Sequence, residues 1–189
     1  RQQDGGIPVS LIQRDHSLLL VVDLQEKLAP AIHEADAVVA NSVRLLEGAR
    51  LLEVPAFVSE QYVRGLGPSL PAIRTAAVNA RFFVKTHFSC AAEPGVLPLL
   101  QAAARPQVIL TGTEANVCVL QTALGLHAAG FEVFLVADAA SSRTPENRHA
   151  AIERLRAAGV RIVTTEMVLF EWLHEAATDT FRTLLPLIK

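Results

Sequence analysis

Residues 106–139 read PQVILTGTEANVCVLQTALGLHAAGFEVFLVADA, and this stretch decides the fold. Its first seven residues and its last nine are apolar runs, which are typical of strands buried on both faces. Residues 115–130 between them have a helix-like pattern that closes on Gly130, because glycine readily takes the left-handed conformation that ends a helix. A strand, a helix and a second strand in this order predict two parallel strands joined by a helical crossover.

The same alternation continues on both sides of this stretch. Further strands are expected at residues 18–22, 55–60, 81–86 and 160–165, and helices at residues 36–52, 93–104, 144–159, 166–173 and 178–188. Thr144 is the expected N-cap of its helix, with Pro145 at the first helical position. Residues 61–71 contain two glycines and two prolines and predict a long loop. Regular alternation predicts an α/β fold in which helices cover a parallel sheet.

Composition limits the classes of function. The chain has 189 residues, 51% hydrophobic and 19% charged, which favours a single domain over residues 1–189 with a polar lead at about residues 1–15. A net charge of -2 without a basic stripe argues against nucleic acid as a partner. The apolar runs are shorter than the roughly 20 residues that cross a membrane. We expect a small molecule or a second copy of the chain as partner.

Cysteine usage indicates the compartment. Two cysteines, Cys90 and Cys118, cannot make a disulfide framework, and the N-terminus lacks the pattern of a secretory signal. The sequence therefore predicts an intracellular, cytoplasmic protein with reduced thiols. Cys90 follows a strand, and we interpret it as a packing residue or a thiol in a pocket wall.

Three reactive side chains follow predicted strands. Asp23 ends the first strand, Lys85 ends the third, and Cys118 begins the helix after the fourth. In such folds ligands bind at the carboxyl ends of the strands, so these side chains should meet on one rim of the sheet. A nearby ammonium and a helix N-terminus favour a thiolate, and a carboxylate can accept the thiol proton. The three residues therefore predict a nucleophilic cysteine.

Other interpretations of these residues are weaker. A lone cysteine near a helix start is more often a small core residue than a nucleophile. Asp23 could be the nucleophile of a phosphatase, but the second aspartate expected two residues later is Gln25. His127 and His149 lie on helices away from the position that a papain-like pair requires. The glycines at 65–67 and 112 match neither common nucleotide-binding motif.

Three segments carry a resemblance to a known family. They are LLLVVDLQEKL (18–28), FFVKTHFS (82–89) and TGTEANVCVLQTALGLHAAGFEVFLVADAASS (111–142). With them the chain resembles the isochorismatase-like cysteine hydrolases, which include nicotinamidases and N-carbamoylsarcosine amidohydrolases. SEQYVRGLGPSLP (59–71) and TTEMVLFEWL (164–173) are similar to the isochorismatase-domain-containing branch, whose substrates are mostly unassigned.

The resemblance implies a fold and a catalytic triad. The fold is a three-layer, Rossmann-like α/β/α structure whose six-stranded parallel sheet has the order 3-2-1-4-5-6. Asp23, Lys85 and Cys118 would be the triad of an enzyme that cleaves a small amide or related carbon–nitrogen bond through a thioester. Two alternatives stay open: cleavage of a vinyl ether such as isochorismate, and a catalytically idle protein that acts in binding or assembly.

The resemblance also implies details of the site. A cis peptide bond between Thr113 and Glu114 would aim backbone N–H groups, including that of Cys118, at the oxyanion. Substrate-pocket residues would be Gln25, Tyr62, His87, Phe88 and Asn116. Nicotinamidases carry an Asp-x-His pair after the second strand, whereas residues 58–65 here read VSEQYVRG. We therefore expect no metal and no cofactor, and we expect a homo-oligomer because family members commonly assemble through their helices.

Overall fold

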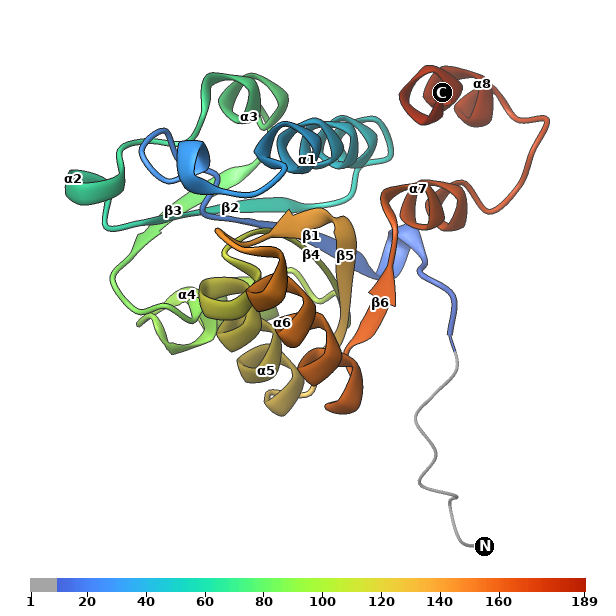
Figure 1. Ribbon diagram of the computed structural model, residues 1–189. Coiled ribbons are helices and arrows are strands. Elements are labelled where there is room, and N and C mark those ends of the chain that lie inside the picture. The colour runs from blue at the N-terminus through green and yellow to red at the C-terminus, as the bar shows by residue number, and fades with distance from the viewer. Residues whose placement is uncertain (1–9) are drawn as a thin grey trace, which may run out of the picture.

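The computed structural model describes residues 10–189, and its strands form one parallel sheet (Figure 1). The strands are β1 (Ser17–Val22), β2 (Ala56–Gln61), β3 (Arg81–Lys85), β4 (Gln107–Thr113), β5 (Glu132–Ser141) and β6 (Arg161–Val163). Their order across the sheet is β3-β2-β1-β4-β5-β6, and every neighbouring pair is parallel. The predicted α/β fold and its strand order are thereby confirmed.

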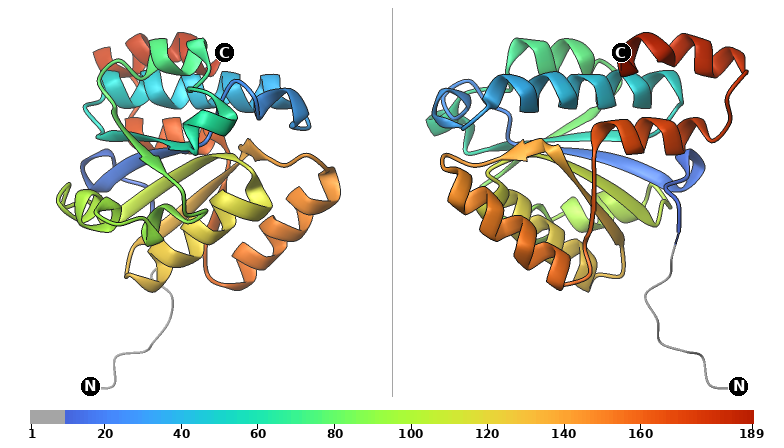
Figure 2. Two further views of the ribbon diagram at one scale, coloured as in Figure 1. Left: turned by 90° about the vertical axis from the view of Figure 1, so that its left-hand side faces the viewer. Right: turned by 45° about the vertical axis from the view of Figure 1, so that its right-hand side comes forward.

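Helices cover both faces of the sheet. They are α1 (Ala35–Leu51), α2 (Val63–Leu66), α3 (Pro71–Ala76), α4 (Val96–Gln101), α5 (Leu120–Ala128), α6 (Pro145–Ala157), α7 (Thr165–Leu173) and α8 (Asp179–Ile188). Figures 1 and 2 show α1, α3, α7 and α8 on one face and α4, α5 and α6 on the other. This is the predicted three-layer architecture. Within residues 10–189, none of the helices is both long enough and apolar enough to cross a membrane.

Each face of the sheet has its own hydrophobic core. On one face, Leu19 and Val21 of β1 pack with residues of α1, α7 and α8, including the fully buried Leu45 and Leu184. On the other face, Leu18, Leu20 and Val22 pack with α4, α5 and α6. Because side chains alternate along a strand, one apolar run supplies both cores. The run Ser17–Val22 is accordingly buried at every position.

The edge strand β3 is much less covered than the central strands. Phe82 and Val84 are 38% and 64% exposed, whereas every residue of β4 is buried. Only the last residue of β3, Lys85, is buried. The edge strand therefore places its one buried charge at the carboxyl end of the sheet, where the candidate site lies.

The carboxyl ends of β1 and β4 approach each other closely at Gly112. This residue pairs with Val22 and has a φ angle of +117°, and a Cβ added there would lie 2.0 Å from the Val22 carbonyl oxygen. Only glycine fits at this position, because any other side chain would collide with the neighbouring strand. The close approach brings the residues that follow β4 next to Asp23, which follows β1.

The crossover in the opening stretch of sequence is not one continuous α-helix. Residues Ala115–Val119 form a π-helical turn, and α5 begins only at Leu120. Gly130 has a φ angle of +98°, as expected for a residue that ends a helix. Thr144 caps α6 as predicted, because its side chain accepts a hydrogen bond from the Asn147 N–H.

Two regions differ from the sequence-based expectations. The loop expected at residues 61–71 contains the helical turn α2, and Pro71 begins the additional helix α3, since proline is pre-organised for the first helical turn. A polar lead was expected at about residues 1–15, and its first nine residues lie outside the described part of the chain. From residue 10 it is part of the fold, because Ile12 is 1% exposed and its N–H donates to Glu171.

Candidate active site

Asp23 follows β1 directly and turns the chain out of the sheet with a φ angle of 51°. The residue is 1% exposed, and each carboxylate oxygen accepts a hydrogen bond from a side chain on another strand. Ser59 Oγ donates to Oδ1 at 2.7 Å, and Lys85 Nζ donates to Oδ2 at 3.0 Å. A buried carboxylate requires such partners, so its orientation is fixed by β2 and β3 together.

Lys85 ends β3 beside Gln61, its partner in the register with β2. The residue is 2% exposed, and its ammonium donates to acceptors on three segments. These acceptors are Asp23 Oδ2 (3.0 Å), Gln61 Oε1 (2.6 Å), the His87 carbonyl (3.2 Å) and the Phe88 carbonyl (2.9 Å). The ammonium is therefore held inside the protein rather than at a solvated strand end.

Cys118 lies in the π-helical turn that follows β4, on the opposite side of β1 from β2 and β3. The residue is 6% exposed, and its thiol lies close enough to Asp23 and Lys85 for both side chains to influence its pKa. The three residues singled out in the sequence are thus brought together. Asp23 lies at the centre of this group, since it contacts both of the others.

The protonation of the thiol differs from the sequence-based expectation. Burial and the Asp23 carboxylate raise the pKa of Cys118 to about 12, and Lys85 lowers it only in part. At neutral pH the resting sulfur is therefore a thiol, although Lys85 and the helix start had suggested a thiolate. The main reason is burial, which disfavours the charged thiolate, and the Asp23 carboxylate further offsets the influence of the Lys85 ammonium.

The pKa values of the other two residues fit this picture. Burial raises the pKa of Asp23, although Lys85 and the hydrogen bonds from Ser59 and Cys118 lower it in part. Burial alone would lower the pKa of Lys85, but the charge and hydrogen bond of Asp23, together with Cys118 and Cys90, more than compensate, and the net change is upward. Asp23 is thereby a stronger base than an ordinary aspartate, and it lies next to a protonated thiol.

The residues expected at the oxyanion site lie beside this group. The Thr113–Glu114 peptide bond is cis, and Thr113 Oγ1 donates to the Asp23 carbonyl at 2.8 Å. The Glu114 carboxylate accepts hydrogen bonds from the N–H (3.1 Å) and Nε (3.0 Å) of Arg143. The Glu114 carbonyl accepts hydrogen bonds from the N–H groups of Val117 and Val119, on either side of Cys118 in the chain.

Four of the five expected pocket residues lie at the carboxyl end of the sheet with at least part of their surface open. Tyr62 and Phe88 are 57% and 54% exposed. His87 is also exposed, and its ring contacts the Glu93 carboxylate at 2.5 Å, which lowers the pKa of Glu93. Asn116 is half-buried, and its side-chain oxygen accepts a hydrogen bond from Ser142 at 2.7 Å.

Gln25, the fifth expected pocket residue, does not line an open pocket. It is 0% exposed, and its carboxamide bonds to backbone groups. Its Nε2 donates to the carbonyls of Gln61 (2.9 Å) and Gly67 (2.7 Å), and its Oε1 accepts from the Gln61 N–H (2.7 Å). Its placement differs from that of the other four residues, because the position after a strand end does not reveal which way the side chain points.

Sequence reasoning missed Ser59 and Gln61 as partners of the triad. Both lie on β2 two residues apart, so their side chains share a face of the sheet with the ends of the neighbouring strands. That alternation was a usable signal, because polar residues in an otherwise apolar strand need partners.

Cys90 is 0% exposed, and its backbone N–H donates to Thr122. Burial raises the pKa of its thiol, and Lys85 lowers it in part.

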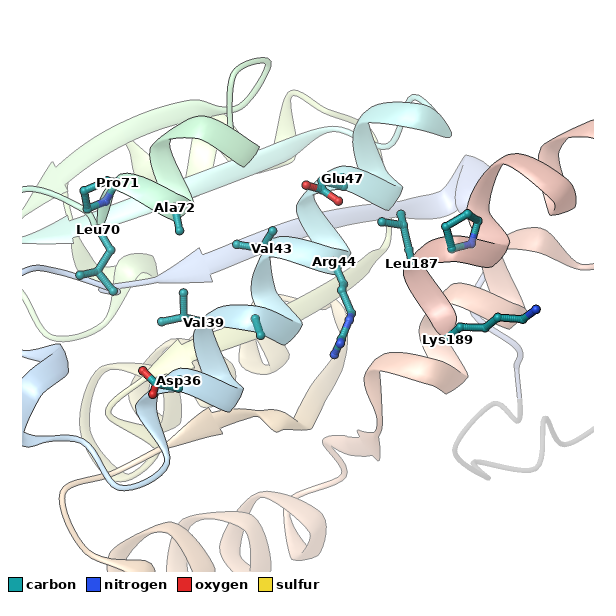
Figure 3. Close-up of a pocket in the computed structure, with 12 residues that line it drawn as sticks. Asp36, Val39, Val43, Arg44, Glu47, Leu70, Pro71, Ala72, Leu187 and Lys189 are labelled. Carbon is teal, nitrogen blue, oxygen red and sulfur yellow. The ribbon is translucent and has the colours of Figure 1, made fainter.

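Other features of the structure lie outside this group. Within residues 10–189, His, Cys, Asp and Glu side chains do not form any group of three or more that could hold a metal ion. A groove of about 650 Å³ lies over α1, between α3 and α8 (Figure 3). Val39, Val43 and Leu187 contribute its apolar surface, and none of the three triad residues lines it. The groove is therefore separate from the candidate active site.

Comparisons with known proteins show the family to which the chain is similar. The family model of the isochorismatase domain matches residues 17–167. The zebrafish (Danio rerio) isochorismatase domain-containing protein 2 is 41% identical over 166 residues, which cover 88% of this chain and 83% of that protein. The zebrafish isochorismatase domain-containing protein 1 is 39% identical over 178 residues, but the chain spans only 61% of its length.

Among solved structures, the MAR1 ribonuclease of Caenorhabditis elegans superposes with a TM-score of 0.89. It is 37% identical in sequence, and the match covers 95% of this chain and 92% of that one. The similarity therefore extends over the sheet and the helices on both of its faces, as well as over the segments that carry Asp23, Lys85 and Cys118.

Proposed function

The chain belongs to the isochorismatase family, and from this premise we propose that it is a cysteine hydrolase that cleaves a small amide or related carbon–nitrogen bond. The observation that carries the proposal is the position of the Asp23 carboxylate between the Lys85 ammonium and the Cys118 thiol. A base in contact with a nucleophile, and itself oriented by a third group, is the recurring arrangement of nucleophilic catalysis.

The first step joins proton transfer to attack. As the Cys118 sulfur forms a bond to the amide carbon, its proton passes to the Asp23 carboxylate, and the carbonyl electron pair moves to the oxygen. A raised pKa suits Asp23 to this transfer, because it makes the carboxylate a better acceptor at neutral pH. The thiol is protonated beforehand, so the proton leaves only when substrate is in place.

The second step breaks the carbon–nitrogen bond. The oxyanion re-forms its carbonyl, the amine leaves with the proton that Asp23 returns to its nitrogen, and a thioester remains on Cys118. Asp23 then takes a proton from water as the water oxygen attacks the thioester carbon. Collapse of this second intermediate releases the acid, and the Asp23 proton regenerates the Cys118 thiol.

Lys85 and the turn before Cys118 have supporting roles in this proposal. Lys85 keeps Asp23 ionised in a site where burial favours the neutral acid. The backbone N–H of Cys118 would donate to the oxyanion, as such groups do in other acyl-transfer enzymes. This role is supported by the two flanking N–H groups, those of Val117 and Val119. Both donate to the Glu114 carbonyl, so the turn around Cys118 is held in place.

The proposal is tested by trapping the intermediate. The protein is mixed with a panel of small amides, acidified during turnover, digested and examined by mass spectrometry. We expect the peptide that contains Cys118 to gain the mass of the substrate acyl group, and the peptide that contains Cys90 to gain nothing. Turnover without any adduct, together with cleavage of isochorismate, would favour the vinyl-ether reaction instead.

Cleavage of RNA is a second candidate, because the similar C. elegans protein is described as a ribonuclease. Burial argues against it here, since Asp23, Lys85 and Cys118 are 1%, 2% and 6% exposed and a phosphodiester backbone is bulky and charged. The net charge of -2 also provides no general attraction for a polyanion. Labelled single-stranded RNA belongs in the same panel, and its cleavage by wild type but not by Cys118→Ala would overturn the amide proposal.

The raised thiol pKa predicts an unusual pH dependence of alkylation. The rate constant for iodoacetamide with Cys118 should rise about tenfold per pH unit from pH 7 to pH 10, because the thiolate fraction grows throughout this range. The alkylation rate of an ordinary thiol is half-maximal near pH 8.5 and levels off about one pH unit above that value. Asp23→Asn should move the profile to lower pH, since it removes a charge that disfavours the thiolate. A plateau at pH 8 to 9 in the wild type would contradict the neutral resting thiol.

A further inference from the structure

The Lys85 ammonium has more acceptors around it than protons to donate. Four oxygens lie within hydrogen-bond distance, and a lysine has three N–H bonds. The shortest contact, 2.6 Å, is to Gln61 Oε1 rather than to the Asp23 carboxylate at 3.0 Å. The neutral side chain of Gln61 on β2 therefore makes a shorter hydrogen bond with this ammonium than the Asp23 carboxylate does.

The orientation of the Gln61 carboxamide is determined by its other end. Gln61 Nε2 donates to the Thr86 carbonyl at 2.9 Å. Reversing the amide would place its NH₂ group against the ammonium and its oxygen against a carbonyl, two repulsive contacts in a buried site. The Gln61 oxygen must consequently face Lys85, and the residue is 8% exposed, so water cannot easily replace it.

The Gln61 backbone is in turn held by Gln25. The Gln25 carboxamide bonds to both the N–H (2.7 Å) and the carbonyl (2.9 Å) of Gln61, which a single amide can do only in one orientation. Its second N–H reaches the Gly67 carbonyl at 2.7 Å. Gln25 is two residues beyond Asp23, so the chain that carries the base also supports the residue that holds the ammonium.

We infer that Gln61 is a positioning residue that sets the place and charge of the Lys85 ammonium, and that Gln25 acts through it. The inference deepens the proposed function, because Lys85 matters there through its hold on Asp23. Without Gln61 the ammonium would lose its closest acceptor and one of the four contacts that fix its position.

The test is direct because the chain has only three lysines, Lys27, Lys85 and Lys189. Lys27 and Lys189 are exposed, so at neutral pH their ammonium protons exchange quickly with water. In a ¹⁵N-labelled sample we expect one persistent ammonium cross-peak, from Lys85, which Lys85→Met removes. In the wild type this peak should also show a nuclear Overhauser effect to the Gln61 side chain.

In Gln61→Met the Lys85 cross-peak should shift, and its protons should exchange at least about tenfold faster because a charge-assisted hydrogen bond is lost. The alkylation profile of Cys118 should move to higher pH, since a less firmly held ammonium favours the thiolate less. Gln25→Met should produce a smaller shift of the same kind, because it leaves the Gln61 side chain in place.

Gln107→Met is the matched control. Gln107 is also a buried glutamine that bridges backbone groups, including the Gln13 N–H and the Leu11 carbonyl, but it begins β4 at the opposite end of the sheet. It should lower the melting temperature without moving the Lys85 peak. An unmoved peak in folded Gln61→Met, or a wild type that lacks the Overhauser effect to Gln61, would overturn the inference. Neither readout needs turnover. Failure of the positioning role of Gln61 can therefore be distinguished from failure of the proposed amide hydrolysis.

Discussion

Cys118→Ser is expected to lower the turnover of a small amide by at least about a thousandfold, with little change in folding. A hydroxyl in place of the thiol has a much higher pKa, and Asp23 is too weak a base to activate it. Cys118→Ala should remove the activity that depends on the nucleophile altogether. The measurement is kcat for the best amide of the panel, with circular dichroism to verify that each variant is folded.

Cys90→Ala is the matched control for this prediction, because Cys90 is also a buried thiol but is not among the main influences on the pKa of Asp23. Its kcat should stay within about tenfold of the wild type, since it removes one small packing atom. Amide turnover that survives in Cys118→Ala would rule out the covalent route. Isochorismate turnover that survives in Cys118→Ala would support the vinyl-ether alternative. A wild-type protein that is inactive on every substrate would support a catalytically idle protein that acts in binding or assembly.

Lys85→Met is expected to lower the free energy of unfolding by about 3 to 5 kcal/mol near pH 8. The substitution leaves the Asp23 carboxylate buried without its charged partner. Loss of Lys85 also raises the pKa of Asp23 further in the folded protein, because the lysine is the largest influence that lowers it. Denaturant unfolding at pH 5 and pH 8 measures the effect.

The sign of the pH dependence follows from linkage. In the folded variant Asp23 holds its proton to a higher pH than in the unfolded chain, so stability is present at low pH and is lost as pH rises through the folded pKa. The deficit relative to wild type should therefore be larger at pH 8 than at pH 5. Asp23→Asn combined with Lys85→Met should recover part of it, whereas the exposed Lys27→Met should change stability by less than about 0.5 kcal/mol. An equal deficit at both pH values would contradict the explanation.

Much of the fold could be predicted because its signals are local. Residues 18–22 are apolar at every position, and residues 106–112 are apolar except for Gln107 and Thr111, which is typical of a strand covered on both faces. Glycine and capping residues such as Gly130 and Thr144 act within one turn of the chain, so their effect does not depend on distant partners. The strand order, in contrast, came from resemblance to a family. The single-domain organisation, the homo-oligomer and the cytoplasmic location remain predictions.

The candidate site was predictable in its members but not in its state. Asp23, Lys85 and Cys118 could be found because parallel strands bring their carboxyl ends to one rim. The protonation of these residues could not be predicted from the sequence, because the pKa of the thiol depends on how deeply it is buried and on which charge lies nearest. Gln25 shows the same limit, since its position suggested a pocket but its amide bonds to backbone on β2.

The sequence by itself determined the alternation of strands and helices and the strand ends that carry reactive groups. These depend on short-range periodicity and on backbone conformation, which are properties of neighbouring residues. Only the tertiary structure decided that Ser59 and Gln61 orient Asp23 and Lys85, and that the sulfur of Cys118 rests as a thiol. Those outcomes depend on distances between side chains from different strands and on the exclusion of water around them.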